Sequence, residues 1–214
     1  MGLGFADMTK TWLPWSAASL ASGSVMMVLG TLMLPADGNF ADLIASVQGE
    51  GGRWVMASFA FFLASVGLTL GLPAVITLLH ERGRRTGLVG IGVWTIGTIG
   101  VAGYAALLIL FRAVVTNSEL GPDDVEAVSN DATLMAFVGI FAVAFYLGEV
   151  LTAIALLRAR SIPKWVALLL LAHPGLQVVS GVMPEFLQDA QSLVLGVALM
   201  GVAVHANEAW TQSV

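Results

Sequence analysis

Six long stretches of apolar residues dominate this sequence and constrain the fold more than any other feature. A helix needs about 20 mainly apolar residues to cross the roughly 30 Å hydrocarbon core of a bilayer. The six stretches are Trp15–Leu34, Trp54–Leu79, Leu88–Val115, Ala132–Leu157, Trp165–Met183 and Glu185–Ala206. Because backbone groups in lipid must bond within their own segment, each stretch is predicted to be an α-helix. The sequence therefore predicts an all-α fold, a bundle of six transmembrane helices forming a single domain over residues 1–214.

The scarcity of charge points to the same environment. Charged residues are 11% of the chain, against about 25% in a typical soluble domain. The lipid bilayer is therefore the first predicted partner, and no basic surface of the kind that binds nucleic acid is present. The chain has no cysteine, which excludes disulfides, thiolate catalysis and cysteine-bound metals.

Positive charges divide the loops into two sets. The turns after the second and fourth spans carry Arg82, Arg84, Arg85, Arg158, Arg160 and Lys164. The longer loops at 35–53 and 116–131 are mainly acidic and include Asp123, Asp124 and Glu126. Since loops rich in Lys and Arg stay in the cytoplasm, both termini are predicted to be cytoplasmic, in a plasma or bacterial inner membrane.

Tryptophans fall at the predicted membrane interfaces, where an amphipathic ring is best solvated. They are Trp12, Trp15, Trp54, Trp165 and Trp210, and only Trp94 lies inside a span. The third span is also rich in glycine, at Gly90, Gly92, Gly97, Gly100 and Gly103. Small residues in a lipid-embedded helix predict close packing against a neighbouring helix.

Glu149 is the only carboxylate well inside a predicted span. A charge at the centre of a membrane helix costs about 2.5–3.5 kcal/mol on insertion scales, so this side chain is expected to face protein or water. The turn between the fourth and fifth spans centres near Ser161, twelve residues from Glu149 and twelve from His173. Equal distances from the turn of an antiparallel hairpin predict equal depth, but the spacing leaves open whether the two side chains face each other.

Further polar side chains accompany this level of the predicted bundle. Tyr146 lies three residues before Glu149, and Gln177 lies four residues after His173, so each pair occupies neighbouring positions on its helix. Thr69, Thr95 and Thr98 lie at comparable depth on other spans. Pro73 and Pro174 interrupt two of the helices. This set predicts a polar binding or proton site, although each threonine by itself is more typical of helix packing.

No cofactor is expected. A haem held by two histidines would need two facing imidazoles, and His80 and His205 at the cytoplasmic ends of their helices are the pair to consider. Histidines in such positions are mostly solvated, so haem is the less favoured alternative.

The segment LLRARSIPKWVALLL, residues 156–170, combines a basic turn with a proline and a tryptophan that open the fifth span. It resembles a hairpin found in uncharacterised bacterial six-helix integral membrane proteins. The resemblance covers this hairpin and implies a fold but no activity.

Three functions are compatible with these patterns. The first is a carrier for a small solute or a proton, with Glu149 and His173 at its polar site. The second is an accessory, scaffold or sensor subunit that binds other membrane subunits. The third is an intramembrane enzyme that uses the same two residues as acid and base, although no third group for substrate activation is evident. Enzymatic activity is the less favoured interpretation, and the oligomeric state stays open.

Overall fold

The computed structural model describes residues 5–34, 39–118, 121–179 and 185–211, with side chains over 12–34, 39–118, 121–179 and 190–211. Every regular element in these ranges is a helix, so the all-α prediction is confirmed. In chain order the helices are α1 (Phe5–Met33), α2 (Phe40–Thr77), α3 (Arg84–Asn117), α4 (Pro122–Ser129), α5 (Ala132–Ala159), α6 (Lys164–Val179) and α7 (Glu185–Thr211).

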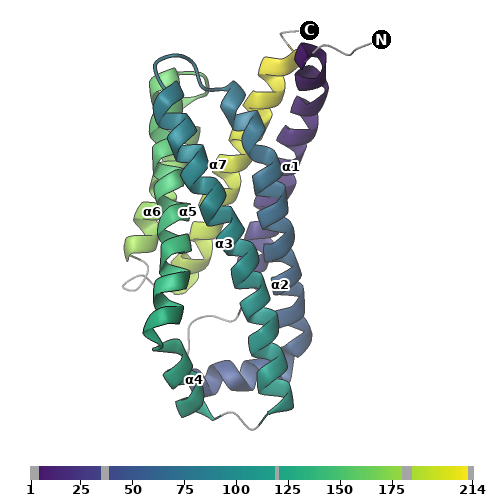
Figure 1. Ribbon diagram of the computed structural model, residues 1–214, viewed down its shortest axis with the longest axis vertical. Coiled ribbons are helices and arrows are strands. Elements are labelled where there is room, and N and C mark those ends of the chain that lie inside the picture. The colour runs from purple at the N-terminus through teal and green to yellow at the C-terminus, as the bar shows by residue number, and fades with distance from the viewer. Residues whose placement is uncertain (1–4, 35–38, 119–120, 180–184, 212–214) are drawn as a thin grey trace.

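The long helices run side by side along the longest axis of the molecule (Figure 1). In this bundle α2 packs between α1 and α3, α3 also packs on α5, and α7 packs on α1 and α6. The start of α1, the end of α7 and the turns α2–α3 and α5–α6 all lie at one end, which we refer to as the terminal end (Figure 1). The opposite end, which holds α4, is the distal end.

Five of the six predicted spans contain a helix that is long and apolar enough to cross a membrane. These stretches are Trp12–Met33, Phe40–Thr77, Arg84–Asn117, Ala132–Ala159 and Ala190–Thr211. The remaining prediction, Trp165–Met183, corresponds to α6, which has 16 residues and is therefore about 24 Å long. Residues 180–183 of that prediction lie outside the described residues. The chain is thus a multi-pass helical protein of membrane type.

At the distal end, helices occupy parts of the two segments that were predicted to be loops, 35–53 and 116–131. α2 is kinked at Glu50 (φ −125°, ψ 35°), and its first part, residues 40–49, is a separate helical segment. Ile44 and Val47 of this segment join Val125 of α4 in a small apolar cluster. Trp54 belongs to the same cluster and is only 3% exposed, with its indole N–H donating to the Ser46 hydroxyl at 3.0 Å. The residues around Ile44 and Val47 therefore help to shield the Trp54 ring from the surroundings.

α1 and α2 approach each other closely at glycine and serine positions. A Cβ on Gly23 or on Gly67 would overlap the backbone of the other helix. Nearer the terminal end, the Ser16 hydroxyl donates to the carbonyl of Leu70 (2.8 Å) and accepts from the amide of Ala74 (3.0 Å). These two backbone groups flank Pro73, which lacks an N–H and weakens the helix at this point. Ser16 therefore bridges α2 where its own hydrogen bonding is interrupted.

α3 and α5 make the second close contact, and it confirms the predicted role of three of the five glycines. A Cβ on Gly90, Gly97 or Gly100 would overlap atoms of α5. Gly92 and Gly103 have open space around the position of a Cβ. On the facing helix, Gly148 admits the backbone of Trp94 in the same way.

The glycine contact yields a prediction about stability. Gly97→Ala is expected to lower the free energy of unfolding by about 1–3 kcal/mol, because the added methyl group must displace the backbone of Phe145. Gly92→Ala on the same helix is the matched control, and it should be neutral or stabilising by up to about 1 kcal/mol through helix propensity. Equilibrium unfolding in detergent micelles measures both, and equal effects of the two variants would contradict the packing account.

Candidate functional site

Glu149 and His173 lie at the same depth on adjacent antiparallel helices. Glu149 precedes the end of α5 at Ala159 by ten residues, and His173 follows the start of α6 at Lys164 by nine. At about 1.5 Å per residue, they lie about 15 Å and 14 Å from the terminal ends of their helices. The two residues therefore lie at nearly the same level of the α5–α6 hairpin.

The two side chains face each other, which the spacing alone could not decide. Nδ1 of His173 lies 2.9 Å from Oε2 and 3.1 Å from Oε1 of Glu149. Glu149 is fully buried and His173 is 6% exposed. The structure therefore holds a carboxylate–imidazole pair that is shielded from the surroundings.

This pair can hold one or two exchangeable protons. With one proton, Nδ1–H of a neutral imidazole donates to the carboxylate, and the pair carries a charge of −1. A second proton makes the pair neutral overall, either as imidazolium with carboxylate or as two uncharged groups. Because a net charge in a low-dielectric interior is costly, proton uptake changes the local electrostatics strongly.

Two of the other predicted site residues belong to this neighbourhood. The ring of Tyr146 lies 5.7 Å from the ring of His173, at an interplanar angle of 45°. Gln177 follows His173 by one turn of α6, and its Oε1 accepts a hydrogen bond of 2.9 Å from Nε2 of Gln191 on α7. Polar groups of α5, α6 and α7 therefore continue from the pair toward the distal end.

The three predicted threonines form a different cluster, between α2 and α3. The hydroxyls of Thr69 and Thr98 lie 3.1 Å apart, and the Thr98 hydroxyl also donates to the carbonyl of Thr95 at 2.9 Å. Ser65 donates to the carbonyl of Thr98 at 2.6 Å. The Thr95 hydroxyl donates to the carbonyl of Ile91 in its own helix. These bonds join two helices and give the threonines a packing role.

Two more polar groups lie near Glu149, and the spacing of three residues already indicated Thr152 as its neighbour on the helix. Nε1 of Trp94 and Oγ1 of Thr152 are buried and have no hydrogen-bond partner among the described residues. Thr152 lies one turn from Glu149 on α5, and the backbone of Trp94 packs on Gly148. An unpaired buried polar group costs about 1–3 kcal/mol. For Trp94, its position inside a span, away from both predicted interfaces, was the available sequence signal.

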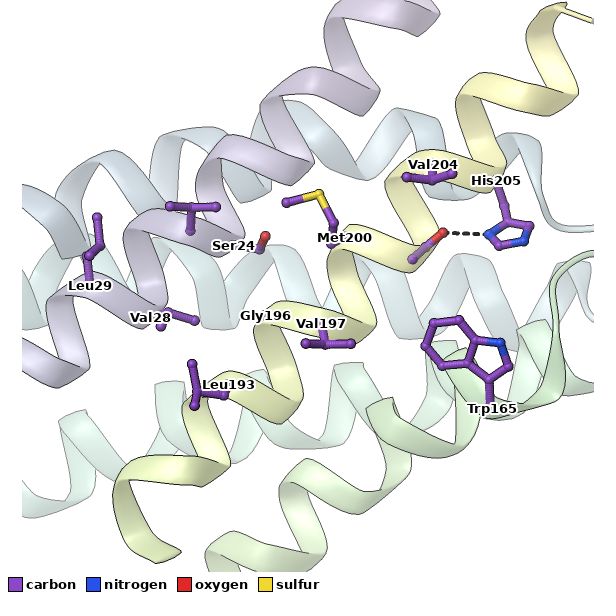
Figure 2. Close-up of a pocket in the computed structure, with 12 residues that line it drawn as sticks. Ser24, Val28, Leu29, Trp165, Leu193, Gly196, Val197, Met200, Val204 and His205 are labelled. Atoms are coloured by element: carbon purple, nitrogen blue, oxygen red, sulfur yellow. Dashed lines mark hydrogen bonds between the residues drawn. The ribbon is translucent and has the colours of Figure 1, made fainter. Parts of the chain in front are cut away.

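A separate apolar groove of about 530 Å³ lies between α1 and α7. Figure 2 shows Val28, Leu193 and Met200 along it, with Trp165 and His205 toward one end. Neither Glu149 nor His173 lines this groove. Apolar walls of this kind suit contact with lipid chains. The groove is therefore separate from the Glu149–His173 site.

The remaining histidines bond to their own backbone segments. Nδ1 of His205 lies 2.7 Å from the carbonyl of Gly201, and Nδ1 of His80 lies 3.3 Å from that of Leu78. Over the described residues, no three His, Asp or Glu side chains lie close enough together to hold a metal ion.

The fold and site together define a class: a multi-pass helical membrane protein with a buried carboxylate–imidazole pair near the middle of its bundle. No protein-family model, curated protein or solved structure matches the chain.

The buried pair yields a prediction about coupling. His173→Leu is expected to lower the free energy of unfolding by about 3–5 kcal/mol, because the carboxylate of Glu149 is left buried without its partner. The double variant Glu149→Leu/His173→Leu should recover most of that loss, since neither charge remains. A double-mutant cycle in micelles measures the coupling, and additive effects of the two single substitutions would show that the contact has no energetic weight.

Proposed function

We propose that the protein is a proton-linked carrier of a small solute, with Glu149 and His173 as the group that binds and releases the proton. The direct contact of these two side chains inside the bundle is the observation that carries the proposal. Ionisable groups at this depth in membrane proteins typically mark ion pathways and proton relays. Tyr146 and Gln177 complete the proposed site.

The proposal includes six crossings, with α6 as the shortest, and cytoplasmic termini in a plasma or bacterial inner membrane. Support comes from the exposed basic residues of the terminal end: Arg82, Arg84, Arg85, Arg158, Arg160 and Lys164. The exposed acidic residues Asp123, Asp124, Glu126 and Asp131 lie at the distal end. This distribution follows the positive-inside rule.

The surroundings of the pair differ between its two sides. Toward the terminal end, α5 and α6 meet through Leu156, Val166 and Leu170, which are completely buried. Toward the distal end, the neighbours are the partly exposed polar side chains Tyr146, Gln177 and Gln191. In the conformation described, the pair is therefore expected to exchange protons and solute with the distal side.

The first test replaces the carboxyl group without changing its size. Glu149→Gln keeps a hydrogen-bonding group opposite His173 but cannot exchange a proton, so flux is expected to fall to the level of protein-free vesicles. Proteoliposomes containing a pH-sensitive dye measure proton movement under an imposed potential, with and without each member of a panel of small solutes. Retained solubility and a monodisperse elution profile in detergent serve as the folding control.

Two results would reject the carrier. Wild-type flux in the Glu149→Gln variant would remove the pair from the mechanism. Wild-type protein that moves no protons above the protein-free background, with any solute of the panel, would reject transport itself.

The second test exploits the absence of cysteine in the chain. Gln177→Cys should react with a membrane-impermeant thiol reagent added from the distal side. Leu170→Cys, two turns away on the same face of α6, should not react from either side. Gln191→Cys and Leu195→Cys form a second matched pair on α7. A tag at the C-terminus fixes the orientation of the vesicles, and labelling confined to the side of the termini would reverse the proposed access.

A second candidate function is that of an accessory subunit, which the ordered distal end favours. α4 exposes Asp123, Asp124 and Glu126, and it is held by the apolar contact of Val125 with the segment at residues 40–49. A structured acidic surface outside the bilayer suits a protein partner with basic residues. Native mass spectrometry of the protein extracted gently from its own membrane distinguishes the two functions, because only the subunit function predicts a co-purifying polypeptide.

A further inference from the structure

A basic pocket lies at the terminal end, between the α2–α3 turn and the last turn of α5. It has a volume of about 590 Å³ and is lined by Arg82, Ile154, Leu157, Arg158 and Arg160. The α2–α3 turn packs tightly on α5, because a Cβ on Gly83 would overlap the carbonyl of Ala155. That close approach brings Arg82 beside the two arginines of α5, although they are far apart in sequence.

The three arginines have no acidic partner in the described part of the chain. The ion pairs found there are Arg53–Glu50 and His173–Glu149, both elsewhere. Arg158 makes one side-chain hydrogen bond, to the Thr86 hydroxyl at 3.3 Å. Glu81 is exposed next to Arg82 in the chain, yet it forms no ion pair with the arginines of the pocket. The pocket therefore gathers three positive charges without compensation.

Arg160 has a backbone conformation that is uncommon for a residue with a side chain. It caps α5 in the left-handed conformation (φ 56°, ψ 30°), and its amide donates to the carbonyl of Leu156 at 3.0 Å. It is the one non-glycine residue with a positive φ in the described chain. Glycine is the usual residue at such a helix end. From this helix end, the Arg160 side chain lines the pocket together with Arg82 and Arg158.

The pocket also has an apolar wall, which lies on α5 on the side of the pocket toward the middle of the bundle. Ile154 precedes Arg158 by four residues and Leu157 by three, so the three side chains lie on one face of α5. Both apolar residues are partly exposed. A ligand held by the arginines would therefore extend along hydrocarbon-compatible surface toward the bilayer interior.

We propose that this pocket binds an anionic phospholipid, with the phosphate on Arg82, Arg158 and Arg160 and one acyl chain along Ile154 and Leu157. Guanidinium groups suit phosphate oxygens because they donate paired hydrogen bonds in a fixed plane. Basic pockets at the cytoplasmic ends of transmembrane helices are typical places for anionic headgroups. This site does not depend on the proposed carrier activity, but it rests on the proposed orientation, in which the terminal end is cytoplasmic.

The test compares lipid retention by matched variants of the full chain. Native mass spectrometry is performed on protein in micelles doped with phosphatidylglycerol or with phosphatidylcholine. Wild type should retain phosphatidylglycerol preferentially, and Arg82→Gln/Arg158→Gln should weaken that binding about 25-fold, or about fivefold per arginine. Arg84→Gln/Arg85→Gln removes two charges from the same end outside the pocket and should leave binding near the wild-type level.

Arg160→Gly separates a binding role from a structural one. Glycine relieves the left-handed conformation, so this variant should melt at the wild-type temperature or above it in phosphatidylcholine. It should nevertheless bind phosphatidylglycerol about fivefold more weakly. If Arg82→Gln/Arg158→Gln proves unfolded, Arg82→Gln and Arg160→Gly each carry the test alone.

Three results would overturn the proposal. Unchanged retention in both pocket variants would show that the arginines hold no lipid. An equal loss in Arg84→Gln/Arg85→Gln would show a diffuse surface potential rather than a site. Retention of glycerol phosphate by the wild type as strong as that of phosphatidylglycerol would show a soluble anion site that does not use the apolar wall.

Discussion

The close contact of α3 with α5 sets the rotation of α5, and the buried pair depends on that rotation. Gly97 and Gly100 of α3 accept Phe145 and Phe141, while Gly148 of α5 accepts the backbone of Trp94. With no hydrophobic effect between helices in lipid, close van der Waals packing at small residues is a main source of association. Gly148 faces α3, so the next residue, Glu149, is turned about 100° around the helix. That rotation is what presents its carboxyl group to His173 of α6.

α2 packs on α3 on one side and is held by α1 on the other. Gly67 and Gly23 bring α1 against α2, and Ser16 completes the hydrogen bonding of α2 beside Pro73. In a medium without water, a backbone amide freed near a proline needs a partner from a neighbouring helix. The two close contacts, α1–α2 and α3–α5, thus hold two pairs of long helices together, and α6 packs between α5 and α7.

The sequence predicted the helices and the depth of the pair because both depend on local counting. Apolar length predicted six spans, and five of them contain a helix of sufficient length. Counting twelve residues each way from Ser161 placed Glu149 and His173 at one level. Rotation could not be counted, since it depends on which glycines meet another helix; Gly97 does and Gly92 does not. The threonines illustrate the same limit. Their depth was compatible with the pair, but Thr69 and Thr98 face each other across α2 and α3 instead.

The distal end was missed for a related reason. Residues 40–49 and α4 are short helices whose apolar residues, Ile44, Val47 and Val125, make sense only against one another. Each segment alone is too short to be predicted as a span, and an isolated helix of this length is marginal in water. Their mutual packing is also what buries Trp54, which otherwise has the position of an interfacial tryptophan.

Stability alone does not account for the carboxylate–imidazole pair. Replacing a buried ion pair by well-packed apolar residues is often neutral or stabilising, and the nearby contacts of α5 with α6 are already made by Leu156, Val166 and Leu170. The hairpin would hold together with two more leucines at its centre. Such a replacement would remove the Glu149–His173 pair. Among the described residues, this is the buried pair of facing side chains that can change its charge by taking up a proton. The proposed proton exchange, rather than packing, would account for these two residues at this level of the hairpin.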